Sequence, residues 1–128
     1  MSRKTVEIFS DSTERSLINS QSGSLVLIDT ENNNVTLNLP PPEPGLYFEF
    51  VIKDGSSNFI LNSVSSSYAA SAIMRFKHNI KSDSPTSGDK LTVTTPSDYD
   101  RILVNCDGTN WYGSVSCDAE NDYVLSSE

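Results

Sequence analysis

The chain has 128 residues, with 17 acidic residues against 9 basic ones and a formal net charge of −8 at pH 7. This charge argues against a nucleic-acid partner, because such binding draws on clustered Lys and Arg. A chain of this length buries about two-thirds of its unfolded surface in one modest core, which indicates a single domain. No apolar stretch fits a signal peptide or a membrane span, so we expect folding in a cytosol and no membrane partner.

The first 22 residues are mostly polar and contain one short predicted strand, residues 5–9. We expect residues 1–22 to form an extended N-terminal arm, residues 23–117 to form the folded domain, and residues 118–128 to form an acidic C-terminal tail. The two ends are either disordered in the isolated chain or paired along the sheet edge of a neighbour, and both alternatives stay open.

Between these ends, apolar residues alternate with polar ones, and clusters of Gly, Pro, Asn and Ser interrupt the alternation at short intervals. A period of two is typical of strands with one face toward a core. The pattern predicts strands over residues 35–39, 46–53, 58–62, 72–81, 91–95, 101–106 and 111–117. Hairpin turns are expected at residues 54–57 and at residues 107–110, where Gly108 would take a positive φ. We therefore predict an all-β fold, a single small β-sandwich or jelly-roll-like barrel of about nine strands with an extended N-terminal arm.

The strand predicted over residues 72–81 has two chemically different faces. One parity is apolar apart from His78, and the other carries Arg75, Lys77 and Lys81. In an otherwise acidic chain this basic stripe is either a solvated outer face or an electrostatic contact with an acidic neighbour, such as the tail of another copy.

Residues suited to catalysis are scarce. His78 is the one histidine, and its place on an apolar parity predicts a hydrogen-bonded core residue rather than a general base. On the predicted final hairpin Cys106 faces Trp111, and Cys117 lies roughly 20 Å further along, too far for a disulfide. We therefore expect two free, mostly buried thiols. Because residues suited to catalysis are scarce, we also expect no enzymatic activity and no cofactor.

Two acidic segments, residues 29–34 and residues 118–122, place oxygen ligands at alternate positions, as calcium-binding loops do. Neither segment has the glycine at the sixth position or the closing Glu at the twelfth. We therefore expect a solvated turn and a solvated tail rather than a metal site.

Three segments resemble a β module of tailed-bacteriophage virion proteins. They are N-V-T-L-N-L-P at residues 34–40, G-L-Y-F-E-F-V-I-K-D at residues 45–54, and residues 98–112, which end in D-G-T-N-W-Y. The resemblance spans residues 25–117 and implies a small β-sandwich or jelly-roll module, often trimeric, of the kind found in head decoration proteins, head fibres and tail fibres. It implies core positions for Leu37, Phe50 and Trp111 and supplies no catalytic residue.

From the resemblance and the short, polar-ended chain we expect a structural, non-enzymatic virion protein, a capsid decoration (cement) protein that binds the assembled shell and stabilises it. Its expected partners are the major capsid protein of the same phage and its own copies in a homotrimer, on the capsid surface of a virion assembled in the host cytoplasm. The expected partner-binding residues are Thr5, Val6, Ile8 and Phe9 of the arm and Arg75, Lys77 and Lys81 of the basic strand.

The alternative function is a receptor- or glycan-binding tip domain of a tail fibre or head fibre. Such a tip would use exposed aromatic side chains, and the candidates are Tyr47, Tyr68, Tyr99 and Tyr112. Uptake onto empty, expanded capsids favours the decoration protein, whereas cell or glycan binding by the isolated chain favours the tip.

Overall fold

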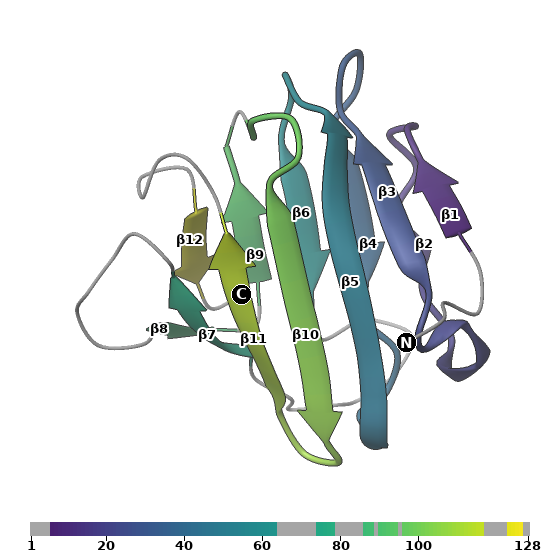
Figure 1. Cartoon of the computed structure of the whole chain (residues 1–128), viewed down its shortest axis with the longest axis vertical. Helices are drawn as coiled ribbons and strands as arrows, with labels where there is room; N and C mark the ends of the chain where they lie inside the picture. The colour runs from purple at the N-terminus through teal and green to yellow at the C-terminus, as the bar shows by residue number, and fades with distance from the viewer. Residues whose placement is uncertain are drawn as a thin grey trace.

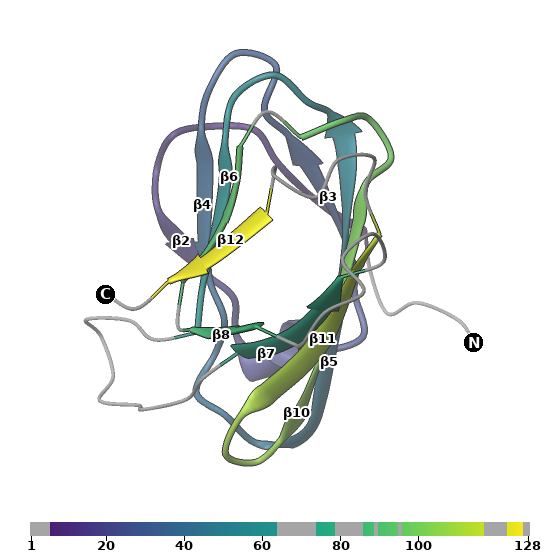
Figure 2. The ribbon, with the colours of Figure 1, turned by 90° about the vertical axis from the view of Figure 1, so that its left-hand side faces the viewer.

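The computed structural model describes residues 6–63, 74–78, 86–88, 90–94, 96–116 and 123–126, of which residues 74–78, 86–88 and 123–126 are described by their backbone alone. These residues form two β-sheets that pack face to face, as Figure 1 and Figure 2 show from two sides. In the same residues the helical structure is one 3₁₀ turn, η1 (Asn19–Gln21). The prediction of an all-β sandwich is confirmed.

Both sheets mix parallel and antiparallel pairs, and the described residues supply seven strands to the first sheet and five to the second. The seven-stranded sheet has the order β1 (Val6–Phe9), β3 (Leu25–Asp29), β5 (Pro44–Asp54), β10 (Arg101–Asp107), β11 (Trp111–Ser116), β7 (Met74–His78) and β8 (Thr86–Gly88). The five-stranded sheet has the order β12 (Tyr123–Ser126), β9 (Lys90–Val93), β6 (Phe59–Asn62), β4 (Val35–Asn38) and β2 (Arg15–Ser16). Each predicted strand segment overlaps an observed strand, and β2, β3, β8 and β12 are additional.

The two predicted hairpins have different outcomes. β10 and β11 form the expected antiparallel hairpin, with Cys106 opposite Trp111 and Gly108 at a φ of 105°. The hairpin predicted at residues 54–57 is wrong, because β5 belongs to the seven-stranded sheet and β6 to the five-stranded sheet. This turn carries the chain across the sandwich, and a Cβ on Gly55 would lie 1.9 Å from the carbonyl oxygen of Pro96. A turn sequence reverses the chain without selecting the strand that will pair with it.

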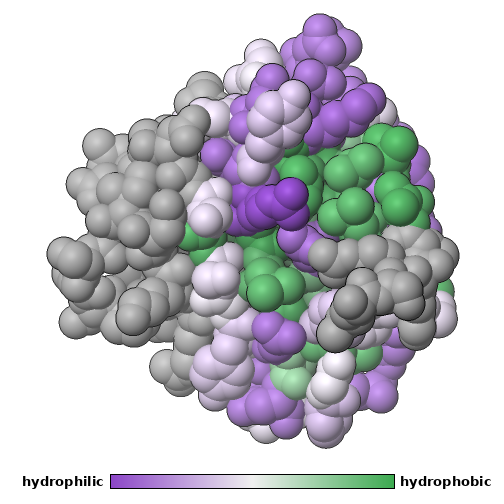
Figure 3. Space-filling view, in the orientation of Figure 1, coloured by the Kyte–Doolittle hydropathy of each residue, from purple (hydrophilic) through white to green (hydrophobic). Residues whose placement is uncertain are grey.

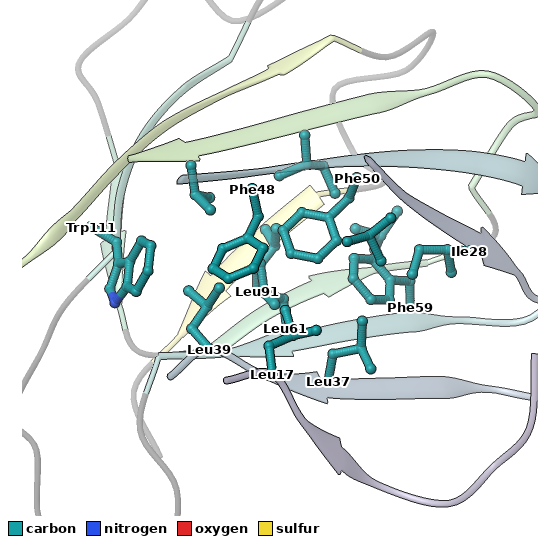
Figure 4. Packing of buried hydrophobic residues seen from close by; sticks show 14 of the residues in the cluster. Leu17, Ile28, Leu37, Leu39, Phe48, Phe50, Phe59, Leu61, Leu91 and Trp111 are labelled. Carbon is teal, nitrogen blue, oxygen red and sulfur yellow. The ribbon is translucent and has the colours of Figure 1, made fainter. Parts of the chain in front are cut away.

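The core lies between the two sheets and forms one cluster of buried side chains (Figure 4). Alternate residues of each strand point inward, so both sheets contribute aromatic and aliphatic side chains. Phe50 contacts Phe48 and Phe59, with ring centroids 6.2 and 5.7 Å apart, and Phe48 contacts Trp111 at 6.2 Å. Leu37, Phe50 and Trp111 are each 0% exposed, as the resemblance implied.

The N-terminal segment is built into the sandwich. β1 pairs in parallel with β3, β2 pairs in parallel with β4, and Leu17, which directly follows β2, is buried in the core. The expected boundary after residue 22 therefore does not separate two structural units in the described residues, since this segment adds an edge strand to each sheet. In the acidic tail, β12 pairs with β9 of the same chain.

Candidate docking surface on the seven-stranded sheet

The outer face of the seven-stranded sheet carries apolar side chains in two neighbouring rows that run across β1, β3, β5 and β10. The strand registers align Ile8, Leu27, Val51 and Arg101 in one row and Val6, Leu25, Glu49 and Leu103 in the other. We call the six apolar members the outer patch: Val6, Ile8, Leu25, Leu27, Val51 and Leu103. Val6, Ile8 and Leu103 are 58%, 60% and 38% exposed. Figure 3 shows this gathering of hydrophobic side chains on the side where β1 and β3 lie.

The outer patch exists because β3 is apolar on both of its faces. Val26 and Ile28 point into the core and are 0% exposed, whereas Leu25 and Leu27 point outward and are half-buried. A strand with one solvated face normally alternates apolar and polar residues, and a strand covered on both faces reads as a continuous apolar run. The apolar sequence of β3 is thus typical of a strand whose sheet is covered on both faces.

One ion pair lies within the outer patch. Arg101 donates a hydrogen bond to the carboxylate of Glu49 across the β5–β10 ladder, at 2.6 Å. The Arg101 side chain is 57% exposed and that of Glu49 is 13% exposed. A partner surface would therefore meet apolar side chains on β1 and β3 and one accessible guanidinium on β10, which can fix the orientation of docking.

The predicted arm residues divide between the two faces of β1. Val6 and Ile8 belong to the outer patch, while the half-buried Phe9 packs against the core. The parity of β1 turns Phe9 to the opposite face from Val6 and Ile8, and its binding to a partner stays a prediction. Thr5 lies outside the described residues.

The predicted basic residues lie toward the opposite edge of the same sheet. Arg75 and Lys77 of β7 stand in register with Tyr112 and Ser114 of β11, which are outer-face positions. Four strands, β3, β5, β10 and β11, separate β7 from β1 in this sheet. The structure thus brings both predicted groups to one sheet but not to one spot, and Lys81 lies outside the described residues.

Sequence reasoning missed four members of the outer patch: Leu25, Leu27, Val51 and Leu103. The available signal was the apolar run L-V-L-I in β3, which leaves no polar parity, together with Val51 and Leu103 at outward positions of otherwise alternating strands. What the sequence could not supply was the strand order, which sets these residues side by side.

The candidate tyrosines do not form one aromatic platform. Tyr47 and Tyr112 flank Asn105 in a third row of the outer face. Tyr99 is 76% exposed and lies in the loop before β10 at a φ of 71°. Tyr68 lies outside the described residues.

One acidic group has the composition of a cation site. Asp29, Glu31 and Asp54 each offer a carboxylate oxygen, and these oxygens lie within 4.8 Å of one another. Oxygen ligands suit calcium or magnesium, but Asp29 also accepts a hydrogen bond from the backbone N–H of Glu31 at 3.0 Å, as in an ordinary turn. Residues 29–34 were expected to form a solvated turn. Asp54 lies beside Asp29 of this segment only because β3 pairs with β5.

The thiol of Cys106 is free and buried, and burial raises its pKa. A raised pKa disfavours the nucleophilic thiolate, which agrees with a packing role. This confirms the predicted free thiol at Cys106, whereas Cys117 lies outside the described residues and the side chain of His78 is not described.

Among the described residues, no helix is both long and apolar enough to cross a membrane. A scan against protein-family models finds no match, and no curated protein and no solved structure matches this chain.

Proposed function

We propose that this chain is a structural, non-enzymatic protein of a tailed-phage virion that binds the outside of the assembled capsid as a decoration protein. The observation that carries this proposal is the outer patch, in which Val6, Ile8 and Leu103 are exposed, Leu25 and Leu27 are half-buried and Val51 is 8% exposed. Contiguous exposed apolar patches with a polar rim are typical of protein-binding surfaces. The resemblance of residues 25–117 to phage virion modules supplies the class of partner.

The size of the outer patch suits a contact that is repeated many times. Four strands about 4.8 Å apart and two rows of side chains cover roughly 250 Å², well below the roughly 800 Å² per partner of a stable binary interface. One such contact alone is weak. On a capsid lattice many copies bind at once, and each copy stabilises the shell because it binds the assembled state.

Charge on the same sheet favours a capsid surface that is apolar at one side and acidic at the other. Arg101 adds an accessible cation beside the outer patch, and β7, whose sequence contains Arg75 and Lys77, pairs with β11 further along the same sheet. In a chain with a net charge of −8, this is a local concentration of positive charge. Such complementarity steers docking and weakens as salt rises.

The test is co-sedimentation with empty, expanded shells assembled from the major capsid protein encoded nearest to this chain in its genome. Leu103→Lys removes a 38% exposed member of the outer patch and sets an ammonium opposite Glu49, so the fold should tolerate it. We expect at least a tenfold loss of shell affinity. The matched control is Thr92→Lys on the outer face of the five-stranded sheet, which should bind as the wild type does.

Equal binding by wild type, Leu103→Lys and Thr92→Lys would contradict the proposed surface, and absence of wild-type binding to such shells would contradict the proposed function. Binding of the isolated chain to host cells or to immobilised glycans, lost on Tyr99→Ala, would favour the receptor-binding tip instead. Tyr99 is the residue that most favours that alternative, because it is the most exposed aromatic side chain of the described residues.

A further inference from the structure

The N-terminal segment joins the two sheets along one side of the sandwich. β1 and β2 are the terminal strands of their sheets on that side, and residues 10–14 carry the chain from one strand to the other. Figure 2 shows this segment in purple, arching between the sheets. We call residues 6–17 the strap, because they span the side of the sandwich opposite to the one where β8 and β12 contact each other.

The strap has little buried surface of its own. Of its side chains, Leu17 is buried, at 2% exposed, Glu7 and Phe9 are half-buried, and the rest are exposed. By contrast, the core side chains of β5 and β10 are at most 8% exposed. Segments with few buried apolar contacts open at a lower free energy than the strands of a core. The strap is therefore suited to open while the rest of the sandwich stays folded.

One asparagine of the five-stranded sheet holds the strap at its C-terminal end. The side-chain Nδ2 of Asn38 donates hydrogen bonds to the carboxylate of Glu14 at 2.7 Å and to the hydroxyl of Ser16 at 3.2 Å. The backbone N–H of Leu17 donates to the carbonyl oxygen of Asn38 at 2.8 Å. Because Asn62 donates to the side-chain oxygen of Asn38 at 2.9 Å, the amide of Asn38 is fixed with its donor toward the strap. We call the three bonds between Asn38 and the strap the latch.

The two strands of the strap depend on each other. β1 has four residues and β2 has two, so the ladder that each strand forms with its sheet is short. An ion pair between Asp11 and Arg15, at 2.6 Å, lies within the strap and spans the crossing between its strands. Fixing one strand lowers the entropy cost of placing the other, because only residues 10–14 separate them. Release of β2 from the latch should therefore release β1 as well.

We propose that the strap opens and closes as one unit, so that the latch on the five-stranded sheet controls the outer patch on the seven-stranded sheet. In the closed form Val6 and Ile8 complete the outer patch, and opening withdraws both of them from it. The consequence for docking rests on the proposed function, whereas the coupled opening does not. A partner that binds the closed form stabilises the latch in return, because coupling between two sites is reciprocal.

The first experiment measures amide hydrogen exchange of the full chain. Glu14→Ala removes the charged acceptor of the latch at an exposed position, so the sandwich should fold normally. We expect the amides of β1 to exchange roughly tenfold faster, because a hydrogen bond to a charged group is lost, while β10 and β11 keep their wild-type rates. The matched control is Glu31→Ala, which removes an exposed carboxylate outside the strap and should leave the exchange of β1 unchanged.

Three results of this experiment would overturn the proposal. Faster exchange of residues 14–17 with unchanged exchange of β1 would show that the two strands open separately. Equal acceleration of β1 and β10 would show that the strap unfolds only together with the whole sandwich. Wild-type exchange of every strand in Glu14→Ala would show that the latch does not hold the strap.

The second experiment measures how opening of the strap affects binding to capsid shells. Leu17→Ala removes the buried anchor of the strap, and we expect roughly a hundredfold faster exchange of β1. The affinity for shells should fall in proportion to the closed fraction, although Leu17 lies in the core and does not belong to the outer patch. The control is Leu91→Ala, because Leu91 is 1% exposed in the same core but lies on β9, which β6 and β4 separate from β2. This control should bind shells as the wild type does.

Wild-type affinity of Leu17→Ala, with β1 open by hydrogen exchange, would overturn the control of the outer patch by the strap and leave the proposed function standing. An equal loss of affinity in Leu91→Ala would overturn it too, because the loss would then follow from a weakened core. A wild type that does not bind shells would contradict the proposed function instead, and the exchange rates would still decide whether the strap opens as one unit.

Discussion

The outer faces of the two sheets differ in polarity and exposure, although their inner faces share one core. On the five-stranded sheet the described outward residues are polar apart from the half-buried Ile60, and the N-terminal segment covers part of them. Asn38 is 2% exposed and donates hydrogen bonds to Glu14 at 2.7 Å and Ser16 at 3.2 Å. On the seven-stranded sheet the outward residues include the outer patch, whose members on β1 are more than half exposed.

The comparison separates residues that hold the fold from residues that are free to bind. The buried asparagines of the five-stranded sheet are joined side by side, because Asn62 donates to the side-chain oxygen of Asn38 at 2.9 Å. Buried polar groups are costly unless they are hydrogen-bonded, so this face is committed to the chain's own stability. The apolar side chains of the opposite outer face gain most from burial that a partner provides.

Removing the amide of Asn38 should give the largest effect on stability. Asn38→Ala withdraws partners from Glu14, Ser16 and Asn62 at a buried position, so we expect a loss of about 2 kcal/mol in the free energy of unfolding. Urea denaturation measures it. The matched control is Asn105→Ala on the exposed outer face of the seven-stranded sheet, which should cost less than about 0.5 kcal/mol. Similar losses for both variants would contradict the division between the two faces.

Breaking the ion pair of the outer patch should have a moderate effect. Arg101→Gln removes an exposed guanidinium bonded to Glu49, and exposed pairs contribute about 0.5 kcal/mol. A double-mutant cycle with Glu49→Gln, measured by urea denaturation at low and high salt, isolates the coupling. We expect the coupling to shrink as salt rises, and a coupling that is independent of salt would show that the pair acts through packing instead.

The smallest effect concerns the turn that closes the β10–β11 hairpin. The carboxylate of Asp107 accepts hydrogen bonds from the backbone N–H groups of Thr109 and Asn110, both at 2.8 Å, and these bonds hold the pKa of Asp107 below its ordinary value of 3.8. The charged form is favoured in the folded state. The contribution of the Asp107 carboxylate to the free energy of unfolding is therefore complete at neutral pH. It is lost as the pH falls below 3.8 through the lowered pKa.

We expect Asp107→Asn to be slightly less stable than the wild type at neutral pH and equally stable at an acidic pH below the lowered pKa of Asp107, where both side chains are neutral. Urea midpoints at the two pH values measure the difference. A difference that persists unchanged in acid would assign the effect to the shape of the amide rather than to charge. Capsid binding at neutral pH should not respond to this substitution, because the turn lies outside the outer patch.

Much of the fold followed from local pattern. Alternation at residues 46–53 identified the inward Phe48 and Phe50, and the D-G-T-N turn identified a hairpin whose partners are adjacent in sequence. The turn at residues 54–57 has similar composition, yet its strands belong to different sheets. Local chemistry specifies that the chain reverses, whereas pairing depends on which distant strand offers a matching face.

The candidate surface was predictable only in part. Val6 and Ile8 were found because an isolated apolar strand in a polar segment stands out, and Phe9 was included because parity alone does not say which side of β1 faces the core. The outer positions of β3, β5 and β10 could not be grouped from sequence. Leu25 and Leu103 are far apart along the chain and come to lie on either side of Glu49 only because β5 pairs with both of their strands.

The sequence by itself determined that this is an acidic, all-β chain with one core and a closing hairpin, because composition and period-two alternation are local properties. Only the tertiary structure decided that the N-terminal segment completes both sheets and that six apolar residues share one outer face. Strand order rests on long-range pairing, where each strand adopts the neighbours that bury its inner face.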